Sequence, residues 1–372
     1  MMTDDTPTYD LLENRNEIVL LYDAVNANYN GNPLSPANKP RIDESTGAGV
    51  VTDVRFKRYL RDQLEEDGHP VYVRAAQTDD GHVSRRVDLL EDRLTEDVRE
   101  RLEEYLGGED EPDEDIGAAL LDEAVDIRMF GATLSIEDNE SPDDTYQRLG
   151  EVAADALPNH YEGPIQFSPA RSLNRPVQLN DSYNSLTSVI ASSEKAEQGG
   201  FGLDDHRAKY ALFPFYGVAN ENAAADTRLR AADVERLDHL CWRALKNQTI
   251  TRSKVGQEAR LYLRVEYEKD SYHIGDLHHL IQLDEGESAS PDQMENITDV
   301  TLDIGPLLNV LEDKSDVIEA VHTNADQLVT FTTGDDAVYR GTELYDHLEA
   351  AVGEESVDVI DPRSLIGQTN TE

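Results

Sequence analysis

The chain is poor in cysteine and in long apolar runs, and each shortage excludes a class of protein. Cys241 is the only cysteine in 372 residues, which excludes an internal disulfide framework and any CxxC metal or redox motif. No apolar run approaches the ~20 residues that a membrane-spanning helix needs. The acidic start, MMTDDTPTYD, does not resemble a signal peptide. We therefore expect a cytoplasmic protein with no membrane partner.

Positive charge is also scarce. The chain has 33 basic and 77 acidic residues, a formal net charge of −44, and the acids are spread over most of its length. Taken alone, this charge argues against nucleic-acid binding, because phosphates repel carboxylates. A surface rich in acids and poor in lysine also suits a salt-rich cytosol, where the screening length falls to ~3 Å at 1 M. We interpret the global charge as the solvent adaptation of an extreme halophile, and only weakly as a clue to partners.

Strand-like and helix-like segments alternate along the chain. Apolar runs or alternation predict strands at 17–25, 126–136, 209–219 and 259–269, the last with one solvated face. Residues 163–176 are predicted to be a strand that turns into a loop. Helical spacing predicts helices at 51–64 and 231–247, and the tail adds strands (VTLDI, QLVTFTT) and helices (GPLLNVLEDKSDVIEAV, TELYDHLEAAV). This order predicts an α+β fold, an antiparallel sheet with helices on one face, for which a ferredoxin-like or RRM-like core is the obvious candidate.

Acidic charge separates two further regions from this core. Residues 87–126 carry 17 acids against three arginines, and we expect an acidic helical insertion over 65–125. Residues 283–372 carry 22 acids against three basic residues and read as an acidic α/β extension. Between these regions, 177–208 is polar, contains glycine and suggests a projecting hairpin or mobile loop.

The segment VTDVRFKRYLRDQL, residues 51–64, gathers basic charge. Phe56, Leu60 and Leu64 form an apolar stripe, and Thr52 or Asp53 can cap the helix. The neighbouring face of this helix holds Lys57, Arg58 and Arg61.

Two other core segments are basic. Residues 163–175 hold Arg171 and Arg175, and residues 242–264 carry six basic residues against Glu258. One interpretation is a single basic face that binds a phosphate backbone, since guanidinium donates two parallel hydrogen bonds to phosphate. The alternative is that each cation pairs with one of the plentiful acids, and charge alone does not decide between the two.

No motif indicates a cofactor, a metal or a catalytic nucleophile. TITRSKVGQ, residues 249–257, could cradle a phosphate but is not a P-loop. His273, His278 and His279 do not have a recognised zinc spacing, and we interpret them as surface or loop histidines. Asp43 is either a lone catalytic carboxylate or, more simply, a turn residue.

Several blocks resemble one family. NRNEIVLLYDAVNANYNGNPLSPANKPRID followed by GVVTDVRFKRYLRDQL resembles the start of the CRISPR-associated backbone subunit of type I effector complexes (Cascade), of the Csh-type branch of subtype I-B. DIRMFGATL, GPIQFSPARSLNRP and YALFPFYGVANENAAADTRLRAADVERLDHLCWRALKNQTITRSKVGQ are similar to its later blocks, in the same order. The resemblance covers roughly residues 14–268.

The resemblance implies an RRM-like palm (14–64 and 126–282), a fingers insertion (65–125), a thumb hairpin (176–208) and an extension (283–372) packed on the palm. Members assemble head-to-tail along one CRISPR RNA (crRNA), beside other Cascade subunits, and present the guide to target DNA, so base pairing reads the sequence. A separate helicase-nuclease cuts the target. A rival reading is a type III-like endoribonuclease that uses Asp43, with Asp53 behind it.

The resemblance also implies residue roles. RNA-binding positions would be Lys39, Arg41, Lys57, Arg58, Arg61, Gln166, Ser168, Arg171, Ser172, Asn174, Arg252, Ser253 and Lys254. Candidates for wedging between bases on the thumb are Leu179, Tyr183, Leu186 and Val189. No catalytic residue, metal or cofactor is expected.

Overall fold

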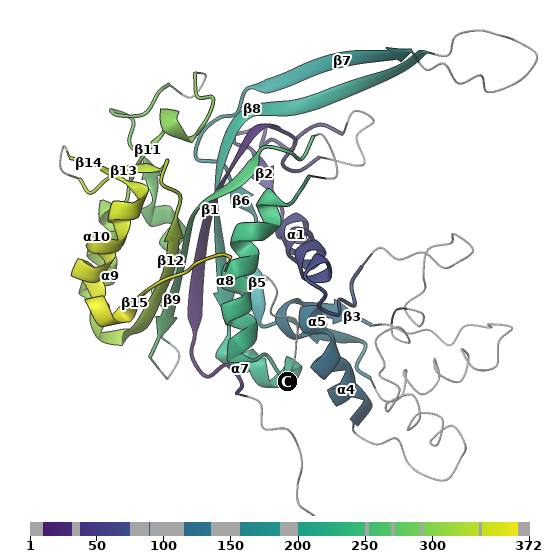
Figure 1. Ribbon diagram of the computed structural model, residues 1–372, viewed down its shortest axis with the longest axis vertical. Helices are drawn as coiled ribbons and strands as arrows, with labels where there is room; N and C mark the ends of the chain where they lie inside the picture. The colour runs from purple at the N-terminus through teal and green to yellow at the C-terminus, as the bar shows by residue number, and fades with distance from the viewer. Residues whose placement is uncertain are drawn as a thin grey trace, which may run out of the picture.

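A seven-stranded sheet forms the centre of the protein, seen in a computed structural model that describes residues 10–31, 38–74, 89, 115–134, 157–186, 200–249, 253–268, 272–290, 293–334 and 337–363. The strand order is β15-β12-β9-β1-β8-β5, and β7 also pairs with β8 (Figure 1). The strands are β1 (Asn16–Ala27), β5 (Ile165–Phe167), β7 (Gln178–Leu186), β8 (Gly200–Ala219), β9 (Gln257–Tyr267), β12 (Ile318–Ala325) and β15 (Val357–Val359). Every pairing is antiparallel except that of β12 with β15, so the predicted α+β class is confirmed.

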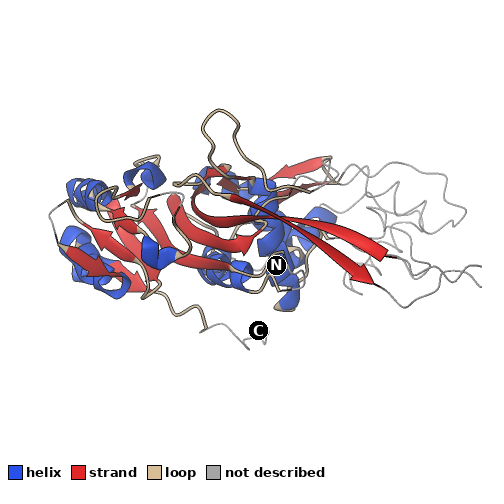
Figure 2. Ribbon diagram, turned by 90° about the horizontal axis from the view of Figure 1, so that it is seen from above, coloured by secondary structure: helices blue, strands red, loops and turns tan. Residues whose placement is uncertain are grey.

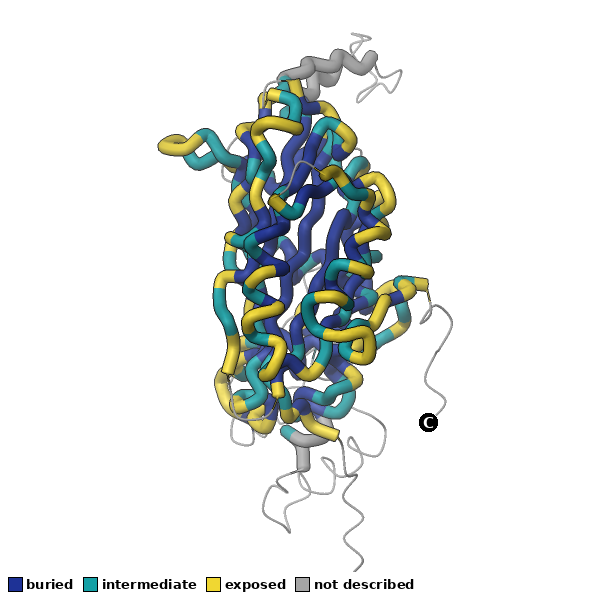
Figure 3. The backbone as a smooth tube through the Cα atoms, turned by 90° about the vertical axis from the view of Figure 1, so that its left-hand side faces the viewer, coloured by how far each residue is buried: buried dark blue, intermediate teal, exposed yellow. Residues whose placement is uncertain are grey.

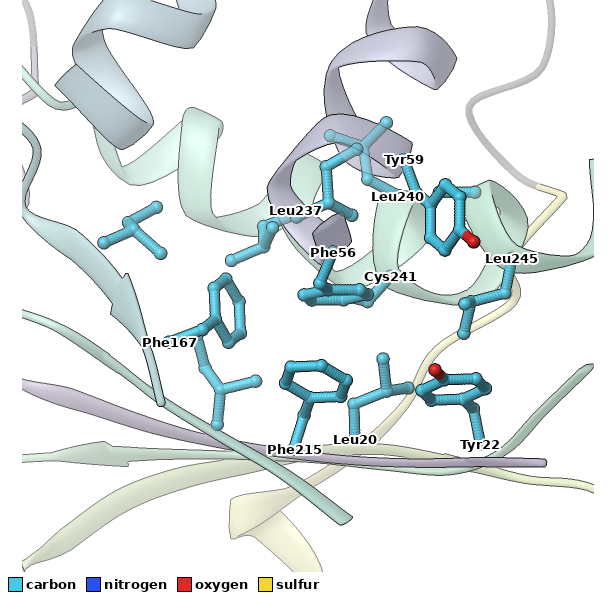
Figure 4. Close-up of a cluster of buried hydrophobic side chains, with 14 of the residues drawn as sticks. Leu20, Tyr22, Phe56, Tyr59, Phe167, Phe215, Leu237, Leu240, Cys241 and Leu245 are labelled. Carbon is cyan, nitrogen blue, oxygen red and sulfur yellow. The ribbon is translucent and has the colours of Figure 1, made fainter. Parts of the chain in front are cut away.

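Two helices, α1 (Asp53–Glu66) and α8 (Ala231–Lys246), cover one face of this sheet. Successive side chains of a strand point to opposite faces, and here Leu20 and Tyr22 of β1 face the helices. Figure 4 shows the core between them, where Phe56 of α1 stacks on Phe215 of β8 with ring centroids 4.6 Å apart. The apolar stripe predicted for α1, formed by Phe56, Leu60 and Leu64, is therefore buried against the sheet together with the apolar face of α8.

The second face is covered by the C-terminal part of the chain. Val19 and Leu21 of β1 lie in a second apolar cluster, together with Leu302, Leu311 and Phe331 from this region. The covering elements are β10 (Gln282–Leu283), β11 (Thr301–Asp303), α9 (Gly305–Asp313), β13 (Thr330–Thr332), β14 (Val338–Arg340) and α10 (Leu344–Val352). Buried residues accordingly run through the middle of the molecule between two exposed layers (Figure 3).

Smaller elements complete the described chain. They are β2 (Val50–Val51), β3 (Gly131–Thr133), β4 (His160–Glu162), β6 (Ala170–Arg171), α4 (Asp115–Glu123), α5 (Val125–Phe130), α7 (Glu221–Thr227), and the 3-10 turns η1 (Leu277–Leu280), η2 (Ile297–Asp299), η3 (Ser315–Val317), η4 (Gly341–Glu343) and η5 (Glu354–Ser356). Within the described ranges, no helix is both long and apolar enough to cross a bilayer.

The strand predicted at 126–136 was wrong over its first half, which forms α5. A short apolar run does not distinguish a strand from a buried helix by its pattern. Tertiary contacts select the helix here: Arg128 forms a buried ion pair with Asp233 of α8 at 2.8 Å, and Asp126 accepts the backbone N–H groups of Tyr72 and Val73.

Two further predictions were wrong. The helix expected to run through DVIEAV ends at α9 and a 3-10 turn, and β12 then adds a strand to the central sheet. β9 is not half-solvated, because nine of its eleven residues are buried and the sheet is covered on both sides. Even its arginines, Arg260 and Arg264, are buried.

The strands β7 and β8 extend beyond the body of the protein as a two-stranded ribbon (Figure 2). This backbone agrees with the hairpin expected within 177–208. Among the residues of β8 whose burial is described, the first member of either apolar cluster is Ala208. Most of the insertion expected at 65–125 lies outside the described residues.

Candidate nucleic-acid interface

Helix α1 has one buried lysine in a polar contact. Lys57 is only 8% exposed, and its Nζ donates to Oε1 of Gln166 on β5 at 2.6 Å. Gln166 in turn donates to the carbonyl of Gly163 at 2.7 Å. Burial lowers the pKa of Lys57. The two side chains line an open pocket of about 400 Å³ beside the β3–β4 pair.

The other two cations of α1 differ in exposure. Arg61 is 12% exposed; it pairs with Asp126 at 2.9 Å and donates to the carbonyl of Gly131 at 3.0 Å. It therefore ties α1 to α5. Arg58 keeps 38% of its side chain exposed and pairs with Asp62 one turn along the helix. Of the three, Arg58 is the one that the helix presents to solvent.

The residues of the block SPARSLN also differ in exposure: some are buried and hold the loop, whereas Arg171 is exposed. Ser172 Oγ accepts the N–H of Gly49 at 2.7 Å and donates to the carbonyl of Asn174 at 2.6 Å. The Asn174 side chain bridges the backbones of Tyr210 and Leu212 on β8. These two residues hold the loop onto the sheet.

Ser168 and Arg171 precede that loop in the chain. The Ser168 backbone N–H donates to the carbonyl of Tyr216 at 2.9 Å, which extends β5 along β8. Arg171 is different from its neighbours, because 64% of its side chain is exposed.

Four cations surround the loop at residues 38–49. β2 pairs with β6 so that Val50 lies opposite Arg171, and the N–H of Val50 donates to the carbonyl of Arg41 at 3.0 Å. The side chain of Arg175 lies against Gly47. All four side chains are exposed, and we call them the basic rim: Lys39, Arg41, Arg171 and Arg175. Arg175 was noted in the sequence as part of a basic loop but was not assigned to phosphate.

The TRSK block anchors the end of β1. Lys254 Nζ donates to the carbonyl of Asn28 at 2.6 Å, and the carbonyl of Ser253 accepts the N–H of Asn28 at 2.7 Å. Burial, helped by the nearby Arg55 guanidinium, lowers the pKa of Lys254 to about 7. Arg252 lies outside the described residues.

The remaining arginines of the basic segment 242–264 pair with acids. Arg243 contacts Asp67 at 2.6 Å, and Arg260 contacts both Asp23 and Asp326. Arg264 pairs with Asp238. For these three arginines the structure supports the second interpretation, in which each cation pairs with an acid of the same chain.

Asp43 lies in a tight turn at the basic rim. Its Oδ1 accepts the hydroxyl and the backbone N–H of Ser45 at 2.6 and 2.9 Å, and its Oδ2 lies 3.3 Å from Arg171 Nε. The Ser45 hydrogen bonds, with help from Arg171, lower the pKa of Asp43 to about 2. Such a carboxylate is a weak general base at neutral pH.

Of the four wedge candidates, three fall on β7. Leu179 is half-buried near the base of the ribbon, and Tyr183 and Leu186 follow along the same strand. Val189 lies outside the described residues.

The fold and the rim define the class: an α+β protein with a doubly covered sheet, a projecting β ribbon and cations displayed around one loop. The family model for CRISPR-associated protein Cas7 matches residues 14–305. A CRISPR-associated protein Cas7 from Haloferax volcanii is 44% identical over 358 residues, which cover 95% of this chain and 98% of that relative. The chain therefore belongs to the Cas7 family, and the resemblance stated from its sequence is confirmed at that level.

Two solved structures are more distantly similar. A chain of a "CRISPR RNA-guided surveillance complex, pre-nicking" gives a TM-score of 0.44 at 13% identity, over 91% of this chain and 100% of that chain. A chain of a "CRISPR RNA-guided surveillance complex" gives 0.39 at 10% identity, over 84% and 88%.

Proposed function

We propose that this chain is a non-catalytic backbone subunit of a Cascade complex, which binds crRNA and assembles with copies of itself and with other subunits along the guide. The guide is then presented for pairing with target DNA. In this proposal the sheet with α1 and α8 is an RRM-like palm, and the β7–β8 ribbon is the thumb. Membership of the Cas7 family supports the assignment.

The observation that carries the proposal is the basic rim. Four cations are exposed around one loop in a chain whose net charge is −44, while the arginines of 242–264 that the structure describes pair with acids. Three of the four are arginines, which bind phosphate through a planar fork of donors. Contacts of this kind position a backbone and do not read bases.

Other side chains extend the surface beyond the rim. Arg58 on α1 keeps 38% of its side chain exposed, and Lys57 with Gln166 lines the neighbouring pocket. We assign the contacts to phosphate to Lys39, Arg41, Arg58, Arg171 and Arg175, and we keep Lys57 and Gln166 as pocket contacts. Arg61, Ser172, Asn174, Ser253 and Lys254 hold the elements that carry this surface.

The test compares two double variants of the full chain. Arg171→Ala with Arg175→Ala removes half of the rim, and Arg340→Ala with Arg363→Ala removes two exposed arginines of the C-terminal part. Binding of a labelled repeat-containing guide RNA is measured at fixed salt. We expect the rim variant to bind at least ~10-fold more weakly and the control to bind like the parent. Equal binding by both variants would refute the assignment.

A further inference from the structure

The segment that connects β9 to the C-terminal layer is anchored on a buried carboxylate. Glu17 of β1 is fully buried, and it accepts the backbone N–H groups of Ile274 and Gly275 at 2.9 Å. The hydroxyls of Tyr216 on β8 and Tyr267 on β9 also donate to it. Three strands and one crossing segment therefore meet at a single carboxylate, which fixes the position of the residues that follow.

Those residues bring together two imidazoles and a carboxylate. Asp276 comes directly after the anchored Gly275 and adopts a left-handed backbone conformation, with φ of 55°. The chain then enters η1, which carries His278 and His279. One ligand atom from each of the three side chains lies within 4.8 Å of the other two.

The two rings are held close together. Their centroids are 4.0 Å apart, and the ring of His278 stacks on Tyr216 at 5.0 Å with an interplanar angle of 24°. The Nδ1 of His278 is buried and has no hydrogen-bond partner within the described part of the chain. A buried ring nitrogen without a partner is costly, and an ion bound between the three side chains would supply one.

We propose that Asp276, His278 and His279 bind a divalent transition-metal ion of the Zn²⁺ type. Neutral imidazole and carboxylate are ligands that Zn²⁺ and Co²⁺ share, with metal–ligand distances of about 2.0–2.2 Å. Tetrahedral coordination at that length places ligand atoms about 3.3 Å apart. Asp276 and His279 are exposed, so rotation of their side chains closes the difference without moving the backbone.

Three protein ligands leave one coordination position for water or for a donor from another molecule. The bound ion would link η1, which carries His278 and His279, to Asp276 at the end of the segment that Glu17 anchors. The sequence pattern, Asp-x-His-His, is not a recognised zinc spacing, and the left-handed turn at Asp276 is what brings the three side chains together. This proposal goes beyond RNA binding and does not depend on the basic rim.

The experiment uses the untagged full chain, stripped with a chelator and titrated with Co²⁺ and then Zn²⁺. We expect one equivalent of Co²⁺ to produce visible d–d absorption, and Zn²⁺ to displace it. His279→Gln and Asp276→Asn should each weaken binding by at least ~10-fold. The matched control is His273→Gln, an exposed neighbour outside the group, which should bind like the parent.

Two results would overturn the proposal. One is the absence of saturable binding in the parent chain. The other is equal affinity in the His279→Gln and His273→Gln variants, which would place the ion elsewhere or on associated RNA. The melting temperatures of the stripped variants should match that of the parent, because the altered side chains are exposed; this check separates loss of a ligand from loss of fold.

Discussion

Arg264 of β9 and Asp238 of α8 form a buried two-point ion pair. Nε and Nη2 of the guanidinium each lie 2.7 Å from a different carboxylate oxygen, and the side chains are 3% and 5% exposed. The hydroxyl of Tyr262 also donates to Asp238, at 2.6 Å. The basic segment 242–264 thus contributes Arg264 to the packing interface between α8 and β9.

Removing one partner of this pair should be strongly destabilising. Arg264→Ala leaves the Asp238 carboxylate buried without its countercharge, and we expect the free energy of unfolding to fall by about 3–5 kcal/mol. Urea unfolding at fixed salt measures the change. Arg340→Ala, at an exposed position, should change the value by less than about 0.5 kcal/mol. A loss below 1 kcal/mol for Arg264→Ala would show that the pair does not stabilise this interface.

The ribbon should be dispensable for stability. Replacing residues 182–204 with a two-residue Asn-Gly turn keeps Asp181 opposite Asp205 and shortens β7 and β8. Among the residues whose burial is described, it removes no member of either apolar cluster. We expect the free energy of unfolding to change by less than ~1 kcal/mol, whereas Phe213→Ala in the core should cost about 3–5 kcal/mol. Under the proposed function, the shortened chain should also form shorter assemblies on guide RNA, as measured by light scattering. Unfolding of the shortened chain would contradict the separation of ribbon and core.

Lys254 should make stability depend on pH. Its pKa is lowered from 10.5 to about 7 by burial, so the unfolded chain binds one more proton than the folded protein between about pH 7 and pH 10. The contribution of this group to the free energy of unfolding therefore rises with pH across that window. The difference between the parent and Lys254→Met should grow by up to ~1.4 kcal/mol per pH unit. The exposed Lys246→Met is the control, and parallel curves for the two variants would contradict the prediction.

Asp43 should not support RNA cleavage. Ser45 and Arg171 hold its carboxylate as a turn-forming acceptor and lower its pKa to about 2, so the residue is a weak general base at neutral pH. The assembled complex is incubated with complementary RNA and Mg²⁺, and the products are separated on a denaturing gel. We expect no cuts from either the parent or Asp43→Ala. Regularly spaced cuts that disappear in Asp43→Ala would replace our proposal with a ribonuclease.

Salt should reveal how many phosphates the rim contacts. On single strands, each contact adds roughly 0.7 to the slope of log K against log salt. Lys39→Ala with Arg41→Ala should therefore flatten the slope by about 1.4. If the protein functions in a salt-rich cytosol, the parent should still retain guide RNA at multimolar KCl, because arginine forks and contacts between copies supplement simple charge attraction. Complete release at that salt would contradict the proposed adaptation.

Much of the fold was predictable because α1, α8, β1 and the second half of β8 have clear patterns. The failures have a physical cause. DIRMF and DVIEAV are short apolar segments whose state is decided by partners distant in the sequence, Asp233 for the first and β9 for the second. β9 appeared half-solvated because its arginines look like surface residues until Asp238 and Asp326 are placed beside them.

For the candidate interface, the sequence predicted which segments carry the cations but not which of those cations are exposed. Composition located cations near residues 39–58 and 171–175, but exposure depends on tertiary pairing, which separates Arg58 from Arg61 and Arg171 from Ser172. Arg175 could have been included from its position in a stretch without acids. The group proposed to bind a metal ion was not predictable, because its spacing matters only once Glu17 and Asp276 bend the chain.

The covered sheet also limits how this protein can change over generations. In β1 the residues from Asn16 to Ala24 are all buried, and those from Ile18 to Tyr22 lie alternately in one core and in the other. Such a strand has no neutral positions, since every substitution disturbs one packing layer. Variation that alters partners or ligands is then confined to the loops at the sheet's ends, the ribbon and the outer layers. Saturation mutagenesis of the gene should find that consecutive positions of β1 do not tolerate substitution. In a strand of a sheet with one exposed face, every second position would tolerate it.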